Sequence, residues 1–150
     1  MTEANSTHYL ARDDYENIHA ALSAWAKRED EPIPPFSLVN ENDIDALVHM
    51  PKHAFFGVPA YPTLAEKAAI IFYTINKRQI FLNGNKRMST LSLLVFLGIN
   101  GKRLTVAPDE LTEKSLWLAK TSSLDFPSIK SELVVWIQHH LENQPREQHS

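Results

Sequence analysis

The amino-acid sequence predicts an all-α fold in a single domain. Its apolar residues recur at intervals of three and four rather than two, which is the spacing that gives a helix one buried face. Glycine is scarce, at 4 of 150 residues, and 43% of the chain is hydrophobic, enough for one compact core. No shift in composition marks a second domain. We expect one domain over residues 1–150, with its core at about 8–141 and a disordered tail at 142–150.

The first predicted helix covers about Asp13–Lys27 and turns its apolar side chains to one face. It ends before residues 31–36, where three prolines remove backbone donors and prevent a helix. The next predicted helix is short. We expect Asn42 and Asp43 to cap it, and it runs to His49.

Residues 52–63 form a predicted flap, because two prolines, a glycine and three aromatic residues suit an extended segment better than a helix. We expect the side chains of Phe55, Phe56 and Tyr61 to anchor this flap on the core as a lid. The alternative is that they form a docking edge for a partner.

The next two predicted helices follow the flap. Thr63 caps the first, with Glu66 completing a capping box, and this helix runs to about Arg78. The second, Met88–Ile99, is apolar on nearly every side, so we expect it to be the buried central helix. The Asn-Gly pair that follows it supplies a left-handed stop. Two further helices are predicted to begin at prolines, because a proline in the first turn of a helix needs no backbone donor. Pro108 begins the first of them, and Pro127 begins the second, which covers Ser128–Leu141.

The overall charge argues against several classes of partner. With 15 basic and 18 acidic residues the net charge is -3, which gives no electrostatic basis for binding nucleic acid or an anionic membrane surface. The chain has no cysteine, and its first residues lack the pattern of a secretory signal, so we expect a cytoplasmic protein. The longest apolar run, at 91–99, is far shorter than the roughly 20 residues that span a bilayer.

The segment QIFLNGNKR, residues 79–87, is the strongest functional signal in the chain. A glycine loop leads directly into an apolar helix whose first turn carries two cations, although the helix dipole favours acids there. Free backbone donors, a permissive glycine and cations at a helix start are suited to hold an anion such as phosphate. We therefore expect Gly84, Asn85, Lys86 and Arg87 to bind an anion. The simpler interpretation is that Asn83 and Gly84 mark only a turn.

This segment resembles the signature of the Fic/Doc (Fido) family, in which a histidine opens the motif, a phenylalanine stands third and an acid stands fifth. Phe81 and the run Gly84–Arg87 match that signature. At the two catalytic positions the chain departs from it, because Gln79 stands in place of the histidine and Asn83 in place of the acid.

The likeness is greatest to the Doc (death-on-curing) branch. The order of helices from about His8 to Leu141 is similar to that branch, Lys86 is its marker, and Thr90 stands where most Fic proteins have a second arginine. The resemblance implies a helical bundle with a buried central helix and a short flap or hairpin, which in the family holds the target by strand addition. It also implies ATP or another nucleotide with magnesium, and an antitoxin partner. The family acts on a target hydroxyl, by AMP transfer in the Fic type and by phosphorylation of elongation factor Tu in the Doc type.

The two departures remove the groups that perform the family's chemistry. There the histidine takes the proton of the attacking hydroxyl, and the amide of Gln79 cannot accept a proton at neutral pH. The family acid binds magnesium, whereas Asn83 offers only a neutral carbonyl, so we expect metal binding to be weakened or absent. The remaining amides and cations need no proton transfer. Phosphate binding without turnover is therefore expected.

Three interpretations stay open on the sequence alone. The first is a Doc-like toxin domain that has lost transfer, through divergence or through deliberate substitution. The second is a non-catalytic module that binds a nucleotide or a protein. The third is an active transferase with relocated acid–base groups, for which His53 is a candidate base. A zinc pair of His49 and His53 is disfavoured, because Pro51 interrupts the helix between them.

Overall fold

The computed structural model describes residues 7–145 and confirms the all-α fold. Its α-helices are α1 (Arg12–Arg28), α2 (Glu41–His49), α3 (Leu64–Arg78), α4 (Asn85–Ile99), α5 (Pro108–Lys120) and α6 (Phe126–His140). Two short antiparallel pairs join β1 (Ala54–Phe55) to β2 (Val58–Pro59) and β3 (Lys102–Leu104) to β4 (Leu141–Asn143). Turns of 3-10 helix lie at Phe36–Leu38, Met50–Lys52 and Ser123–Asp125. In the described range, no helix combines the length and apolarity needed to cross a bilayer.

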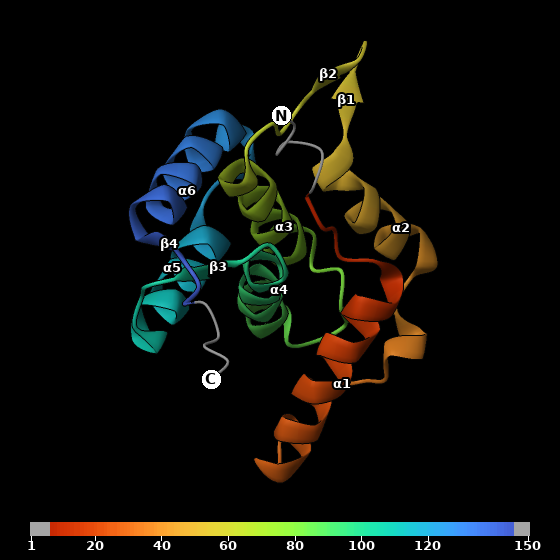
Figure 1. Ribbon diagram of the computed structural model, residues 1–150. Coiled ribbons are helices and arrows are strands. Elements are labelled where there is room, and N and C mark those ends of the chain that lie inside the picture. Colours follow the sequence, from red (N-terminus) through yellow and green to blue (C-terminus); the bar gives the residue numbers. More distant parts are fainter. Residues whose placement is uncertain (1–6, 146–150) are drawn as a thin grey trace, which may run out of the picture.

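Helix α4 lies at the centre of the bundle, as predicted (Figure 1). It packs most extensively on α3 and also contacts α1, α5 and β3. Its fully buried apolar side chains are Met88, Leu93, Phe96 and Leu97. Burial does not extend all round the helix, since Leu94, Val95 and Ile99 are exposed.

The limits of α1 and α3 lie within one residue of the predicted ones. In contrast, α4 begins three residues before the predicted Met88 and α6 begins two residues before the predicted Ser128. The details of the caps also differ. For α2 the predicted cap was wrong, because Asn40 Oδ1 accepts hydrogen bonds from the N–H groups of both Asn42 and Asp43. Those two residues already lie inside the first turn, so they are the capped and not the capping residues. At α3, Thr63 Oγ1 accepts from Glu66 N–H at 3.1 Å as predicted. The Glu66 carboxylate accepts a hydrogen bond from the Thr63 hydroxyl and not from the Thr63 N–H. The capping box is therefore half formed.

The predicted flap is a hairpin of β1 and β2 that projects from the body of the molecule (Figure 1). Its two-residue turn is Phe56–Gly57, and both residues have positive φ, 51° and 80°. The expectation of a lid anchored on the core was wrong for two of the three aromatic residues. Phe55 is 61% exposed and Phe56 is fully exposed, and only Tyr61 is half-buried. The tight turn carries the two phenylalanines away from the helices, where no core surface is available to them.

The prediction of disorder was wrong for the first residues of the tail. Leu141–Asn143 forms β4, in which Glu142 pairs with Arg103 of β3 in the backbone register and also accepts a hydrogen bond from its side chain at 2.9 Å. Composition was misleading here, because the backbone groups of a polar segment can still pair with a strand. Residues 146–150 of the predicted tail lie outside the described residues. Gly101, with a φ of 74°, turns the chain out of α4 towards β3 as predicted.

Candidate functional site

The predicted motif forms the loop between α3 and α4, and the side chain of Asn85 holds this loop closed. Asn85 Oδ1 accepts a hydrogen bond from Phe81 N–H at 2.9 Å, and Asn85 Nδ2 donates one to Phe81 O at 2.6 Å. The Phe81 ring is fully buried beside His19 and Phe36, with ring centres 5.7 and 6.1 Å away. The loop is therefore fixed to the core at Phe81 and to the helix start at Asn85.

Two residues of the motif have left-handed backbone conformations. Gly84 has a φ of 77°, and a Cβ at this position would lie 3.4 Å from Leu22 Cδ2 of α1, so glycine suits both the conformation and the space. Gln79 ends α3 with a φ of 48°, which is uncommon for a residue other than glycine and is typical of functional sites. Asn83 Oδ1 accepts a hydrogen bond from Gly84 N–H at 2.7 Å. One of the predicted anion donors is therefore occupied by a neighbouring side chain.

Helix α4 begins with free backbone donors and without a capping side chain. Its first intrahelical hydrogen bond runs from Met88 N–H to Gly84 O at 2.8 Å, so the N–H groups of residues 85–87 have no acceptor within the helix. The first turn of α4 carries no acid, whereas α1, α2, α3 and α5 each carry at least one there. Lys86 and Arg87 take that place instead. This helix start is thus suited to attract an anion.

A cavity of about 540 Å³ opens in front of this helix start. All the predicted site residues line it: Gln79, Asn83, Gly84, Asn85, Lys86 and Arg87. The remaining wall comes from the last turn of α3 and from one face of α5. The structure therefore brings the predicted residues together around a space that a ligand can enter.

Of residues 7–145, those that line the cavity include cations but no carboxylate and no imidazole. Its cations are Lys77, Lys86 and Arg87. The Lys77 ammonium is already engaged, because it donates hydrogen bonds to Leu118 O and Thr121 O at the end of α5. No cluster of three or more His, Asp or Glu side chains able to hold a metal occurs in residues 7–145. The lining can bind a negative charge but offers no general base and no anionic ligand for a metal ion.

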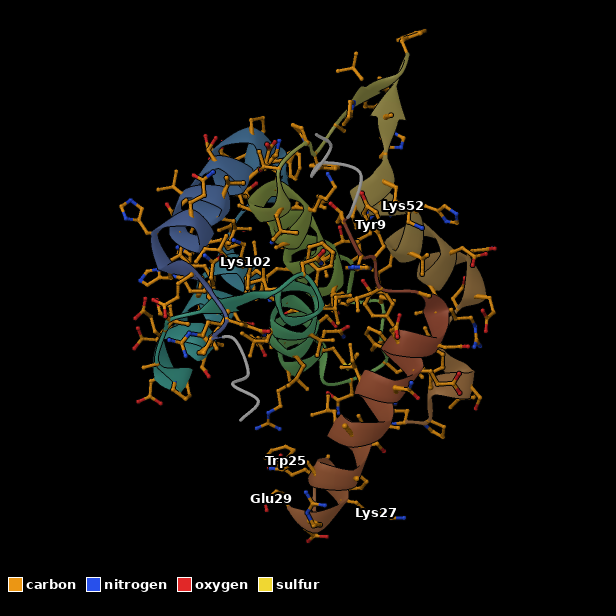
Figure 2. All side chains as sticks on the ribbon, in the orientation of Figure 1. Tyr9, Trp25, Lys27, Glu29, Lys52 and Lys102 are labelled. Carbon is orange, nitrogen blue, oxygen red and sulfur yellow. The ribbon has the colours of Figure 1, made fainter. Side chains whose placement is uncertain are left out.

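Arg87 lies at the rim of the cavity, against the end of α1. Its Nη1 atom is 3.7 Å from the Glu31 carboxylate, and both side chains are more than half exposed. Figure 2 shows Trp25 on the side of α1 that is turned towards α4, and the Arg87 guanidinium lies over the ring of this residue. A single long contact between exposed groups leaves most of the guanidinium donors available.

The chain is similar in sequence to proteins of a known family. A profile of the Fic/DOC family matches residues 9–97, which is well over half of the chain. The chain belongs to the Fic/DOC family. It is also 34% identical over 91 residues to Toxin Doc of Mycolicibacterium smegmatis, a match that covers 60% of this chain and 70% of that protein. The matched residues include α1, the hairpin, α3 and the whole motif loop.

The cavity of this Fic/DOC protein includes residues that the sequence analysis missed. Asn76 lies in the last turn of α3, and Thr112, Ser115 and Ala119 share one face of α5. A weak signal was present, since these three positions recur at intervals of three and four and carry small or polar side chains. Nothing in the sequence indicated that this face of α5 is turned towards the motif.

The histidines considered as a replacement base do not line the cavity of this Fic/DOC chain. His53 precedes β1 and packs edge-on against Phe55, with ring centres 4.5 Å apart. The hairpin and the motif loop lie at opposite ends of α3, a helix of 15 residues and thus about 22 Å in length (Figure 1). His19 lies behind the motif, buried between Phe81 and Phe36, and burial lowers its pKa from the usual value.

Proposed function

We propose that this Fic/DOC protein is a Doc-like domain that binds the phosphate of a nucleotide at residues 79–87 and has lost most or all of the family's transfer activity. The observation that carries the proposal is the composition of the cavity lining. Anion donors lie on one side of the cavity, and none of the described residues brings a carboxylate or an imidazole to its lining.

The phosphate would bind at the start of α4. The N–H groups of residues 85–87 point out of the helix end, and Lys86 and Arg87 add positive charge beside them. Arginine presents a planar fork that matches two phosphate oxygens, and lysine acts as a point charge. The Gly84 N–H joins this set once the Asn83 side chain turns away from it.

The transfer step would fail because the site lacks a general base and an anionic ligand for magnesium. A missing general base lowers the rate by about 10² to 10⁴, and Gln79 supplies none. Magnesium prefers anionic oxygen ligands, whereas Asn83 offers a carbonyl that is already hydrogen-bonded to Gly84. We therefore expect ATP, or another nucleotide, to bind with little dependence on magnesium and to be turned over slowly or not at all.

The biological setting that we propose is a toxin–antitoxin system in the cytoplasm. Its support is the 34% identity to a protein named Toxin Doc. The partner would then be an antitoxin, and the ancestral target would be elongation factor Tu. An alternative within the same family is a nucleotide- or protein-binding regulatory module, which the acid-free lining would suit equally well. The lining gives no support to an active transferase with relocated groups, because the described residues bring no carboxylate and no imidazole to it.

Nucleotide binding can be measured by calorimetry. ATP should bind to the unaltered chain both with magnesium and with a chelator present, and the double substitution Lys86→Gln with Arg87→Gln should abolish binding. The matched control is Lys120→Gln with Lys27→Gln, which removes equal charge at exposed positions outside the lining. Loss of binding in this control, or no binding by the parent, would overturn the proposal.

Loss of catalysis is tested by restoring the two family residues. The double variant Gln79→His with Asn83→Asp should gain magnesium-dependent transfer from ATP to elongation factor Tu and should arrest growth when it is expressed. The two single variants are the controls, and each should remain inactive or nearly so. Strong transfer by the unaltered chain would contradict the proposal, and silence of the double variant would favour the regulatory module.

A further inference from the structure

His19 of α1 lies directly behind the motif loop, residues 79–84, and its ring is part of the packing that holds this loop. The residue is only 4% exposed. Its ring is stacked on the Phe81 ring, with centres 5.7 Å apart, and meets the Phe36 ring edge-on at 5.6 Å. The proposed function makes no use of this buried titratable group, which therefore calls for a separate explanation.

Phe81 connects the His19 ring with the start of α4. Its N–H donates a hydrogen bond to Asn85 Oδ1 at 2.9 Å, and its carbonyl oxygen accepts one from Asn85 Nδ2 at 2.6 Å. The Phe81 residue is only 1% exposed, and His19 provides one of the surfaces on which its ring packs. If Phe81 moved away from His19, both hydrogen bonds to Asn85 would break. The helix start that carries the anion donors would then lose its connection with the core.

The segments that pack on the His19 ring carry no acid. Phe36–Leu38 and residues 79–84 contain no titratable side chain. One turn before His19 on α1, the titratable residues are Tyr15, which is fully buried, and Glu16, which forms an ion pair with an arginine of the same helix. Burial lowers the pKa of His19, as expected for an imidazole that has no anionic partner.

The charges that neighbouring elements bring to this part of α1 also disfavour a cation at His19. The Arg12 guanidinium lies over the Phe36 ring, 5.3 Å from its centre, and α2 contributes Glu41, whose carboxylate is paired with the same Arg12 at 2.6 Å. Helix α4 contributes a further cation, Arg87, which lies over a ring of α1. A positive charge on His19 would therefore add to existing cations, while the acids of α1 and α2 named here are already paired.

We infer that the His19 ring is an acid-sensitive switch for the motif loop, and that its protonation releases Phe81 and disassembles the anion site at the start of α4. The neutral ring fits between two aromatic rings, whereas an imidazolium needs contact with water, which it gains when the loop moves away. In the open form the His19 ring would have an ordinary pKa near about 6.5, so acid favours the open form. The opening itself does not depend on the proposed function; only its effect on anion binding does.

Hydrogen exchange followed by NMR measures the opening at the Phe81 N–H, which Asn85 protects. The protection factor corrects for the chemical effect of pH, and it should fall up to about tenfold from about pH 7.5 to about pH 5.5 if the open form takes up one proton. Low concentrations of urea should not change it, because a local opening exposes little surface. The Phe72 N–H in the middle of α3 is the reference, since it should be more strongly protected and should respond to urea.

Two variants remove the titrating ring. In His19→Phe and in His19→Gln, the protection of the Phe81 N–H should no longer depend on pH. The matched control is His139→Phe at an exposed position of α6, which should keep the whole effect. Constant protection in the parent, a pH effect that persists in the His19 variants, or a urea response equal to that of Phe72 would each overturn the inference. The parent measurements decide it even if neither His19 variant folds.

Sulfate tests the link with the anion site, because it keeps both negative charges over this range of pH. At about ten times its dissociation constant, sulfate should slow exchange at the Phe81 N–H about tenfold. If calorimetry shows that sulfate binds while this exchange is unchanged, the anion donors do not depend on the loop and the inference is wrong on that point. If no sulfate binds, the proposed phosphate site fails, and the exchange data alone decide the role of His19.

Discussion

The guanidinium carbon of Arg87 lies 4.2 Å from the centre of the Trp25 ring, so that the last turns of α1 support a side chain of the motif. Stacking of this kind contributes about 0.5 to 2 kcal/mol, depending on exposure. The Glu31 carboxylate is 3.7 Å from the same guanidinium. A bound phosphate would have to compete with this carboxylate for Arg87. The segment that follows α1 thus bears on the affinity of the site.

The first prediction concerns this competition. Glu31→Gln should raise the affinity for phosphate up to about fivefold, because an exposed ion pair contributes about 0 to 1 kcal/mol. Glu29→Gln removes the same charge from a nearby exposed position that has no ion pair with Arg87. Calorimetry at two salt concentrations measures both. An equal effect of the two variants would show that only the general charge matters, and the specific role of Glu31 would be wrong.

The second prediction concerns the loop. Asn85→Ala removes both hydrogen bonds to Phe81 and leaves two backbone groups without partners, so the free energy of unfolding should fall by about 1 to 3 kcal/mol. Asn83→Ala is the matched control, since its side chain bonds only to the adjacent Gly84 N–H at an exposed position. Urea denaturation measures both variants. A larger loss for Asn83→Ala than for Asn85→Ala would contradict the closing role of Asn85.

The third prediction concerns pH. Burial lowers the pKa of His19, so the folded protein resists protonation of this ring, while the unfolded chain takes up a proton near pH 6.5. The free energy of unfolding should therefore fall as the pH drops below about 6.5. His19→Phe keeps a ring between Phe36 and Phe81 and should reduce the slope of the free energy of unfolding against pH. Urea denaturation from about pH 7.5 to about pH 5.5 gives the measurement.

The control for this experiment is His139→Phe on α6, an exposed position. It should keep most of the slope, because His19 is still present. A slope that is unchanged in His19→Phe would show that other groups cause the loss of stability in acid.

The fourth prediction concerns the hairpin. Phe56 is fully exposed and has a φ of 51°, a conformation that asparagine adopts more readily. Phe56→Asn should therefore leave the free energy of unfolding within about 0.5 kcal/mol of the parent, or raise it slightly. Tyr61→Ser should lower it by about 1 kcal/mol or more, because this half-buried ring packs under the Lys130 ammonium. Thermal unfolding followed by circular dichroism compares them. Destabilisation by Phe56→Asn would restore the idea of an anchored lid.

The sequence by itself determined the helices and the chemistry of the motif. Helix limits follow from interactions between residues three or four apart, from prolines and from caps, so the predicted limits of α1 and α3 differ from the structure by one residue at most. The absence of a base at Gln79 and of an acid at Asn83 can be read directly from the residue types. The co-location of residues 79–87 around one space was likewise predictable, because these residues are adjacent in the chain.

Only the tertiary structure decided what surrounds the motif. Asn76 and Ser115 are 39 positions apart, and their hydrogen bond exists because α3 packs against α5. The contacts of Arg87 with Trp25 and Glu31, and the pairing of β3 with β4, likewise join segments distant in sequence. Local periodicity specifies which face of a helix is buried, but it does not specify which other helix covers that face. That choice depends on how all the buried faces fit together, and it places the α5 wall of the cavity.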